Sequence, residues 1–103
     1  MKVIENEPRF WFLLSHNDDF YIDVNCNVSA FGFSMLVKLN NEELTQFKSN
    51  GREYINSLAE NIQYYSQSKY KNRHTLGEIG KLVHEVIMEF NNQNKAPNNA
   101  YKK

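Results

Sequence analysis

Hydrophobic and polar positions alternate over residues 20–26, FYIDVNC, and again over residues 30–39, AFGFSMLVKL. A period of two is typical of β-strands that bury one face, because successive side chains point to opposite sides. Residues 9–16, RFWFLLSH, are apolar at both alternating sets, as in a strand covered on both faces. Asn17 and Asp18 suit a tight turn between the first two segments. Together the segments predict three consecutive strands in an antiparallel meander.

After the last strand the spacing of apolar residues becomes helical. Asn40 followed by Glu43 has the form of a helix N-cap with an acidic residue at the third helical position. Gly51 suits the left-handed residue just past a helix end. Thr75 followed by Glu78 has the form of a second capping box. These signals predict three helices, at residues 41–49, 52–66 and 76–91.

Strands followed by helices predict an α+β fold, in which an antiparallel sheet carries about three C-terminal helices packed on one face. We expect a single domain over residues 1–92, which begins with a loose lead-in over residues 1–8. A flexible polar tail follows over residues 93–103. The predicted helical contribution to the core comes from two apolar faces, formed by Ile55, Leu58, Ile62, Leu82, Val83, Val86 and Ile87. The other face of the sheet is then open to solvent, at least in part.

Composition narrows the possible partners. The 103 residues include twelve Lys and Arg and twelve Asp and Glu, so the formal net charge at pH 7 is zero. Nucleic-acid binding generally depends on excess positive charge. The loop at residues 66–74 places Lys69, Lys71 and Arg73 beside Tyr70, which could hold a phosphate backbone, but a solvated loop is the commoner outcome. We therefore expect no direct binding to nucleic acid.

Cys26 is the single cysteine, so the chain has no internal disulfide and no cysteine-based metal site. It belongs to the apolar set of its strand, which predicts a buried small hydrophobe. The first residues contain no apolar stretch of the kind found in signal peptides, and no run approaches the roughly 20 residues of a membrane helix. We expect a cytoplasmic protein that does not associate with a membrane.

The three histidines, His16, His74 and His84, are the candidates for acid–base or metal chemistry. None belongs to a recognised motif, and the positions one helical turn from His84 are Gly80 and Met88, which are not metal ligands of that kind. We expect no metal, no small-molecule cofactor, no catalytic residue and no enzymatic activity. A small metal-independent nuclease that uses these histidines is the alternative.

The polar set of the second predicted strand is acidic. Alternation places Asp19, Tyr21, Asp23 and Asn25 together on the face opposite to the buried set. Tyrosine provides contact area at low entropic cost, and aspartates complement a basic partner. The neighbouring acidic positions that would extend this surface are Asp18, Glu42 and Glu43. These seven residues form a predicted partner-binding surface, with an ordinary solvated sheet face as the alternative.

The order of segments resembles the immunity proteins of bacterial contact-dependent growth-inhibition systems. An aromatic first strand, FWFLL, precedes an aspartate-bearing second strand, FYIDVNCNVSA. A third strand leads into LNNEEL, and a helix, GREYINSLAENI, follows. The resemblance covers roughly residues 9–73 and lies in segment order and texture.

The resemblance implies a protein that binds and neutralises the cognate toxin domain of the same system inside the producing cell. Many such toxins are nucleases with basic substrate-binding surfaces, which an acidic, tyrosine-bearing face would suit. Immunity families share no common binding signature, so the resemblance assigns no role to any single residue. A regulatory or structural subunit without a toxin is a third hypothesis, beside the inhibitor and the small nuclease.

Overall fold

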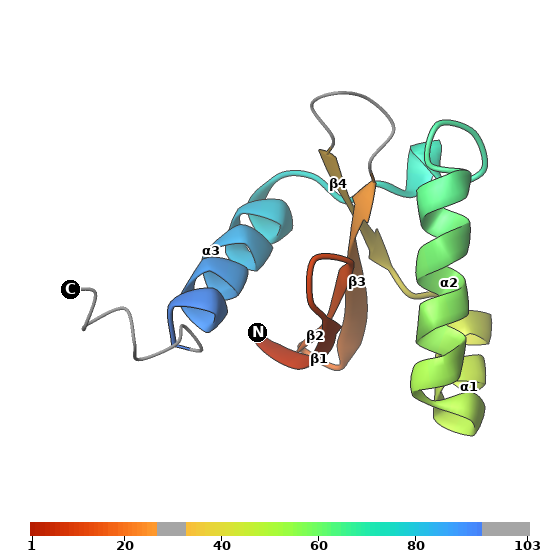
Figure 1. Ribbon diagram of the computed structural model, residues 1–103, viewed down its shortest axis with the longest axis horizontal. Coiled ribbons are helices and arrows are strands. Elements are labelled where there is room, and N and C mark those ends of the chain that lie inside the picture. The colour runs from red at the N-terminus through yellow and green to blue at the C-terminus, as the bar shows by residue number, and fades with distance from the viewer. Residues whose placement is uncertain (27–32, 94–103) are drawn as a thin grey trace.

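The computed structural model describes residues 1–26 and 33–93 as a four-stranded antiparallel sheet followed by helices (Figure 1). The strands lie in the order β1-β2-β3-β4, which is the meander predicted for an α+β fold. The elements are β1 (Lys2–Glu7), β2 (Trp11–His16), β3 (Asp19–Cys26), β4 (Phe33–Lys38), α1 (Asn41–Asn50), α2 (Arg52–Tyr64), the 3₁₀ turn η1 (Lys71–Arg73) and α3 (Glu78–Gln93). The first three residues of the predicted strand at 30–39 and most of the predicted tail lie outside the described residues.

The strand β1 was not predicted, because residues 1–8 were expected to form a loose lead-in. It pairs with β2 from Lys2 opposite Ser15 to Glu7 opposite Trp11, with a bulge between Val3 and Glu5. An edge strand with a bulge has an irregular pattern of exposure, so alternation in its sequence is weak. The sheet therefore has four strands in place of the three that the pattern indicated.

The start of α1 agrees with the prediction. The Asn40 side chain accepts a hydrogen bond from the Glu43 backbone N–H at 2.8 Å, and Glu43 accepts one from the Asn40 N–H at 2.9 Å. Gly51 ends the helix with a positive φ of 63° and donates its N–H to the Phe47 carbonyl at 2.7 Å. Glycine adopts this positive φ without strain, whereas a residue with a side chain would not, so the chain can turn at Gly51 and α2 can start immediately after α1.

The predicted capping box at Thr75 does not start α3. The Thr75 N–H donates to the Leu36 carbonyl at 2.7 Å, so this residue is bonded to the edge of β4. Gly77 follows with a positive φ of 83°, and the helix begins at Glu78. Leu76, the first residue of the helix predicted at 76–91, is 73% exposed. The tertiary hydrogen bond to β4 thus overrides a local helix-start signal.

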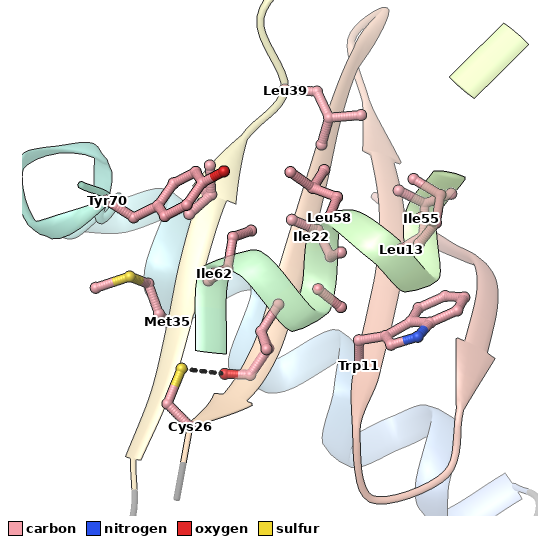
Figure 2. Close-up of a cluster of buried hydrophobic side chains, with 13 residues drawn as sticks. Trp11, Leu13, Ile22, Cys26, Met35, Leu39, Ile55, Leu58, Ile62 and Tyr70 are labelled. Carbon is pink, nitrogen blue, oxygen red and sulfur yellow. Dashed lines mark hydrogen bonds between the residues drawn. The ribbon is translucent and has the colours of Figure 1, made fainter. Parts of the chain in front are cut away.

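The principal core lies between one face of the sheet and the helices α1 and α2 (Figure 2). The Trp11 indole N–H donates to the Asn56 side-chain oxygen at 2.8 Å, which ties β2 to α2. Cys26 is fully buried, as predicted, and its thiol donates to the Val24 carbonyl with a 3.6 Å separation. The fully buried aliphatic and aromatic members of this core are Trp11, Leu13, Ile22, Val24, Val37, Ile55, Ala59 and Ile62.

The helix α3 lies on the opposite face of the sheet, so the prediction that all helices share one face is wrong (Figure 1). A second buried cluster joins Leu14, Tyr21 and Leu36 of the sheet to Val83 of α3. The physical reason is the apolar character of both sides of β2, which requires a cover on each side. For the same reason Val83, Val86 and Ile87 do not pack with the apolar face of α2.

Candidate functional site

The polar face of β3 exists as the alternation predicted, but it lies on the side of the sheet that α3 covers. Tyr21 is only 5% exposed and packs in the second cluster with Leu14, Leu36 and Val83. A side chain buried in this way helps to hold α3 against the sheet and cannot contact a partner directly. The face of β3 that was predicted to be open is therefore covered in part by α3.

The predicted residues at the two ends of β3 remain accessible. Asp18 is exposed in the hairpin turn with a positive φ of 70°. Asp19 pairs with Lys38 of β4 at 3.4 Å, and both side chains are about half exposed. At the other end, the Asn25 amide donates to the Arg9 carbonyl at 3.1 Å. Asp18, Asp19 and Asn25 thus lie at the ends of β3 and form no continuous patch with Tyr21.

The two predicted glutamates of α1 have different environments. Glu42 is exposed in the first turn, whereas Glu43 is only 8% exposed. Both carboxylate oxygens of Glu43 accept hydrogen bonds from the Arg73 guanidinium, at 2.7 and 2.8 Å. Burial raises the pKa of Glu43, but the Arg73 and Asn40 hydrogen bonds outweigh it and hold this pKa below its ordinary value. The negative charge of Glu43 is therefore paired with Arg73 and is not free to attract a partner.

The same ion pair changes the interpretation of the basic loop. Arg73 also donates to the Lys38 carbonyl at 2.8 Å, which fixes η1 against the end of β4. Tyr70 is 4% exposed and belongs to the principal core. Two of the four residues that could have held a phosphate backbone are thus engaged in holding the fold together.

A cavity of about 700 Å³ lies between α3, the β3–β4 part of the sheet and the segment at residues 74–77. We call it the α3 groove. Asp23 is the one predicted binding residue that lines it. Leu76 and Met88, which are 73% and 51% exposed, line it as well. The remaining lining residues are Ser34, Leu36, His74, Thr75, Gly77, Gly80, Lys81, Val83, His84, Glu85 and Ile87.

Asp23 occupies an unfavourable electrostatic position in this groove. Its cross-strand neighbours are Phe12 in β2 and Leu36 in β4, so apolar side chains flank the carboxyl group. Burial raises the pKa of Asp23 from 3.8 to about 6, and the positive charge of His84 opposes part of that rise. No hydrogen bond or ion pair joins Asp23 to another residue in the described part of the chain. The desolvation of this carboxyl group is thus offset only in part, by His84.

The histidines are distributed unevenly. His74 and His84 both line the α3 groove with Asp23, whereas His16 lies at the end of β2 and contacts the Asn17 side chain at 3.3 Å. A carboxyl group with a raised pKa beside imidazoles can exchange protons near neutral pH. Within residues 1–26 and 33–93, no group of three His, Cys, Asp or Glu side chains is arranged to hold a metal ion.

The groove itself was missed by the sequence analysis. It depends on the placement of α3 opposite β3, which brings Asp23 near residues 51 to 65 positions later in the chain, from His74 to Met88. Periodicity shows which face of a helix is apolar but not which side of the sheet that face covers. The apolar character of both sides of residues 9–16 was the one signal that pointed to a second covered face.

Comparison with protein-family models, with curated proteins and with solved structures finds no match to this chain. The helices in the described part of the chain are all too short or too polar to cross a membrane.

Proposed function

We propose that the chain is an immunity protein that binds and neutralises the toxin domain of a contact-dependent growth-inhibition system, and that the α3 groove is the centre of its docking surface. The observation that carries the proposal is Asp23, an acidic residue without a bonded partner among the described residues, in a groove that also exposes Leu76 and Met88. The segment order that resembles immunity proteins supports the same conclusion.

The groove combines the features of an interface centre. Protein interfaces concentrate apolar contacts at a core from which water is excluded, with a few polar groups that fix orientation. Leu76 and Met88 are large apolar side chains that water covers in the free protein. A partner that covers them would also desolvate Asp23 further, so it must bring a positive charge. This requirement fits the basic surface of a nuclease toxin.

The predicted surface is revised accordingly. Asp23 stays at the centre, and Asp18, Asp19 and Glu42 stay as exposed or half-exposed positions that would act through long-range attraction of a basic partner. Asn25 is neutral and half-exposed, so it would act only through direct contact. Tyr21 and Glu43 support the fold and would affect binding only indirectly.

Co-expression tests the proposal. The partner to use is the toxin domain at the end of a large surface-displayed protein whose gene directly precedes the gene for this chain. We expect the two proteins to purify together and the cells to survive toxin expression. Leu76→Ser should weaken both effects, because it removes an exposed apolar contact of the groove. Tyr64→Ser is the matched control, since Tyr64 is 80% exposed and does not line the groove.

Two results would contradict the proposal. One is a cognate toxin fragment that neither purifies with the chain nor is neutralised by it. The other is equal loss of binding in the Leu76 and Tyr64 variants, which would place the docking surface elsewhere.

A small metal-independent nuclease remains the second candidate, because Asp23, His74 and His84 share one groove. The purified chain would then cleave RNA or DNA without added metal. His74→Ala and His84→Ala would abolish cleavage, and His16→Ala would not. We expect no cleavage by the wild-type protein. Activity that persists through repurification and follows this pattern of variants would favour the enzyme.

A further inference from the structure

We propose that the α3 groove is a guanidinium site, in which an arginine side chain of the basic partner pairs with Asp23 while its alkyl stem lies against the apolar walls. This inference rests on the proposed function for the source of the arginine. The preference of the groove for a guanidinium can be tested with the chain alone.

The first argument is the unmet hydrogen-bonding capacity of Asp23. An ionised carboxylate is an acceptor with about four lone-pair sites. None of these sites receives a hydrogen bond from a residue in the described part of the chain. A guanidinium can donate two parallel N–H groups to one carboxylate, which is the strongest pairing available to it among protein side chains. A ligand of this kind would supply the charge and the donors together.

The protein already contains the same pairing in another place. Arg73 meets both oxygens of Glu43 in a fork with separations of 2.7 and 2.8 Å. That internal partner holds the pKa of Glu43 below its ordinary value, whereas Asp23 has no such partner and its pKa is raised. Glu43 is therefore a carboxylate paired with a guanidinium, whereas Asp23 is a carboxyl group without such a partner.

The second argument concerns the walls of the groove. Leu36 and Val83 are 3% exposed and line the cavity next to Asp23. A guanidinium is planar and more weakly hydrated than an ammonium, so it enters a half-apolar site at a lower desolvation cost. The volume of about 700 Å³ lies within the range of ordinary ligand sites and exceeds what one side chain requires. The site therefore favours arginine over lysine and admits neighbouring partner atoms.

Other charged and titratable groups line the same cavity as Asp23. They are Lys81, His84 and Glu85 from α3 and His74 from the segment before it. None of them forms an ion pair with Asp23 in the described structure. Binding is best measured at pH 7.5, where Asp23 is ionised.

The direct test is a titration of the full chain with n-butylguanidinium, followed by backbone and carboxyl NMR signals. We expect saturable shifts at Asp23, Leu36 and Val83 and a fall in the Asp23 pKa below 6. n-Butylurea is the neutral control of similar shape, and n-butylammonium tests the preference for a planar cation. Equal affinity for the urea and the guanidinium would overturn the inference, and so would equal affinity for the ammonium.

A variant and a pH series locate the effect at Asp23. Asp23→Asn should weaken n-butylguanidinium binding at least about tenfold, whereas Glu60→Gln should leave it unchanged, because Glu60 is exposed on α2 and does not line the groove. If the Asp23 variant does not fold, the wild-type pH series decides. Affinity should fall about tenfold between pH 7.5 and pH 5 in step with the Asp23 carboxyl signal. Affinity that does not follow this signal would overturn the inference.

The two proposals can fail separately. Toxin binding that survives Asp23→Asn at wild-type affinity would uphold the immunity function and overturn the guanidinium site. Binding of n-butylguanidinium at Asp23 without any binding of the cognate toxin fragment would uphold the cation site and overturn its assignment to the toxin.

Discussion

At the scale of single residues, two carboxyl groups respond to burial in opposite ways. Asp23 has apolar neighbours and a raised pKa, so its charged form costs stability. Glu43 is also buried, but the Arg73 guanidinium reverses the effect and lowers its pKa. The largest contribution to this difference is the bonded Arg73 guanidinium, and the Asn40 backbone hydrogen bond adds to it. The pair provides two tests in which pH acts with opposite sign.

Asp23→Asn should stabilise the protein near neutral pH. The pKa of Asp23 is about 6 in the folded state and near 3.8 in the unfolded chain. The contribution of this group to the free energy of unfolding therefore falls as pH rises from 3.8 to about 6. The full shift would correspond to about 3 kcal/mol, and water in the open groove reduces this to about 1–2 kcal/mol. Urea unfolding should show that the gain in the variant is larger at pH 7.5 than at pH 4. A gain that is equal at both values would contradict it.

Arg73→Ala should destabilise the protein by about 2–4 kcal/mol at pH 7, because it leaves the buried Glu43 carboxylate without its positively charged partner. The loss should shrink as pH falls below the ordinary glutamate range, where Glu43 becomes neutral in the variant. Denaturant unfolding of the variant measures both effects. Arg52→Ala is the control, since Arg52 pairs with Glu5 and Glu7 at the surface and should matter less. Equal losses would show that Arg73 has no special role.

At the scale of elements, the helices on the two faces differ in how firmly they pack. Four residues of α2 are buried, whereas Val83 is the buried residue of α3. The α3 helix is also held by Phe90, whose ring meets Phe12 edge-on with centroids 5.8 Å apart. A helix with less buried surface opens more readily than its neighbours. The groove therefore lies beside a helix that packs less tightly than α2.

Alanine substitutions should show this difference. Ile62→Ala in α2 removes a fully buried side chain and should cost about 3–4 kcal/mol. Val86→Ala in α3 removes a half-buried side chain and should cost about 1 kcal/mol. Chemical denaturation measures both, and native-state hydrogen exchange should be faster in α3 than in α2. Equal costs would mean that α3 is packed as tightly as α2.

The local signals in the sequence predicted elements well where no distant contact competed with them. The capping box at Asn40 and the turn at Gly51 are present as predicted, and the alternation in β3 sets the correct faces. The signal at Thr75 failed because its backbone N–H bonds to Leu36 in β4. That contact joins positions far apart in the chain, so no local pattern could reveal it.

At the scale of the whole molecule, the sheet separates the principal core on one face from the second buried cluster under α3 on the other (Figure 1). Adjacent residues of β3 serve the two sides in turn, with Ile22 and Val24 in the core and Asp23 between them in the groove. The sequence identified Asp23 as a candidate because alternation fixes its face. It could not show the groove, because the position of α3 is a property of the assembled fold.

The thiol of Cys26 should report on the integrity of the whole fold. It is fully buried at the end of β3, and burial raises its pKa, so both access and thiolate formation are suppressed. Reaction with a disulfide reagent at pH 8 should be at least about 100-fold slower than in concentrated urea. The Ile62→Ala variant should react faster, in proportion to its loss of stability. Rapid reaction of the native wild type would show that the end of β3 opens locally.

The bulge in β1 bears on how separate copies of the chain behave at high concentration. The other outer strand, β4, has its edge occupied in part by the bridge from Val37 to His74. At the β1 edge, Arg52 of α2 donates to the Asn6 carbonyl at 3.2 Å and pairs with Glu5 and Glu7. The rest of this edge is exposed, and an exposed edge invites pairing with a strand from another copy. The irregular spacing between Val3 and Glu5 breaks the register that such pairing needs. The charges of Glu5 and Glu7 near this edge add a desolvation cost, so the fold carries its own protection against aggregation through its sheet.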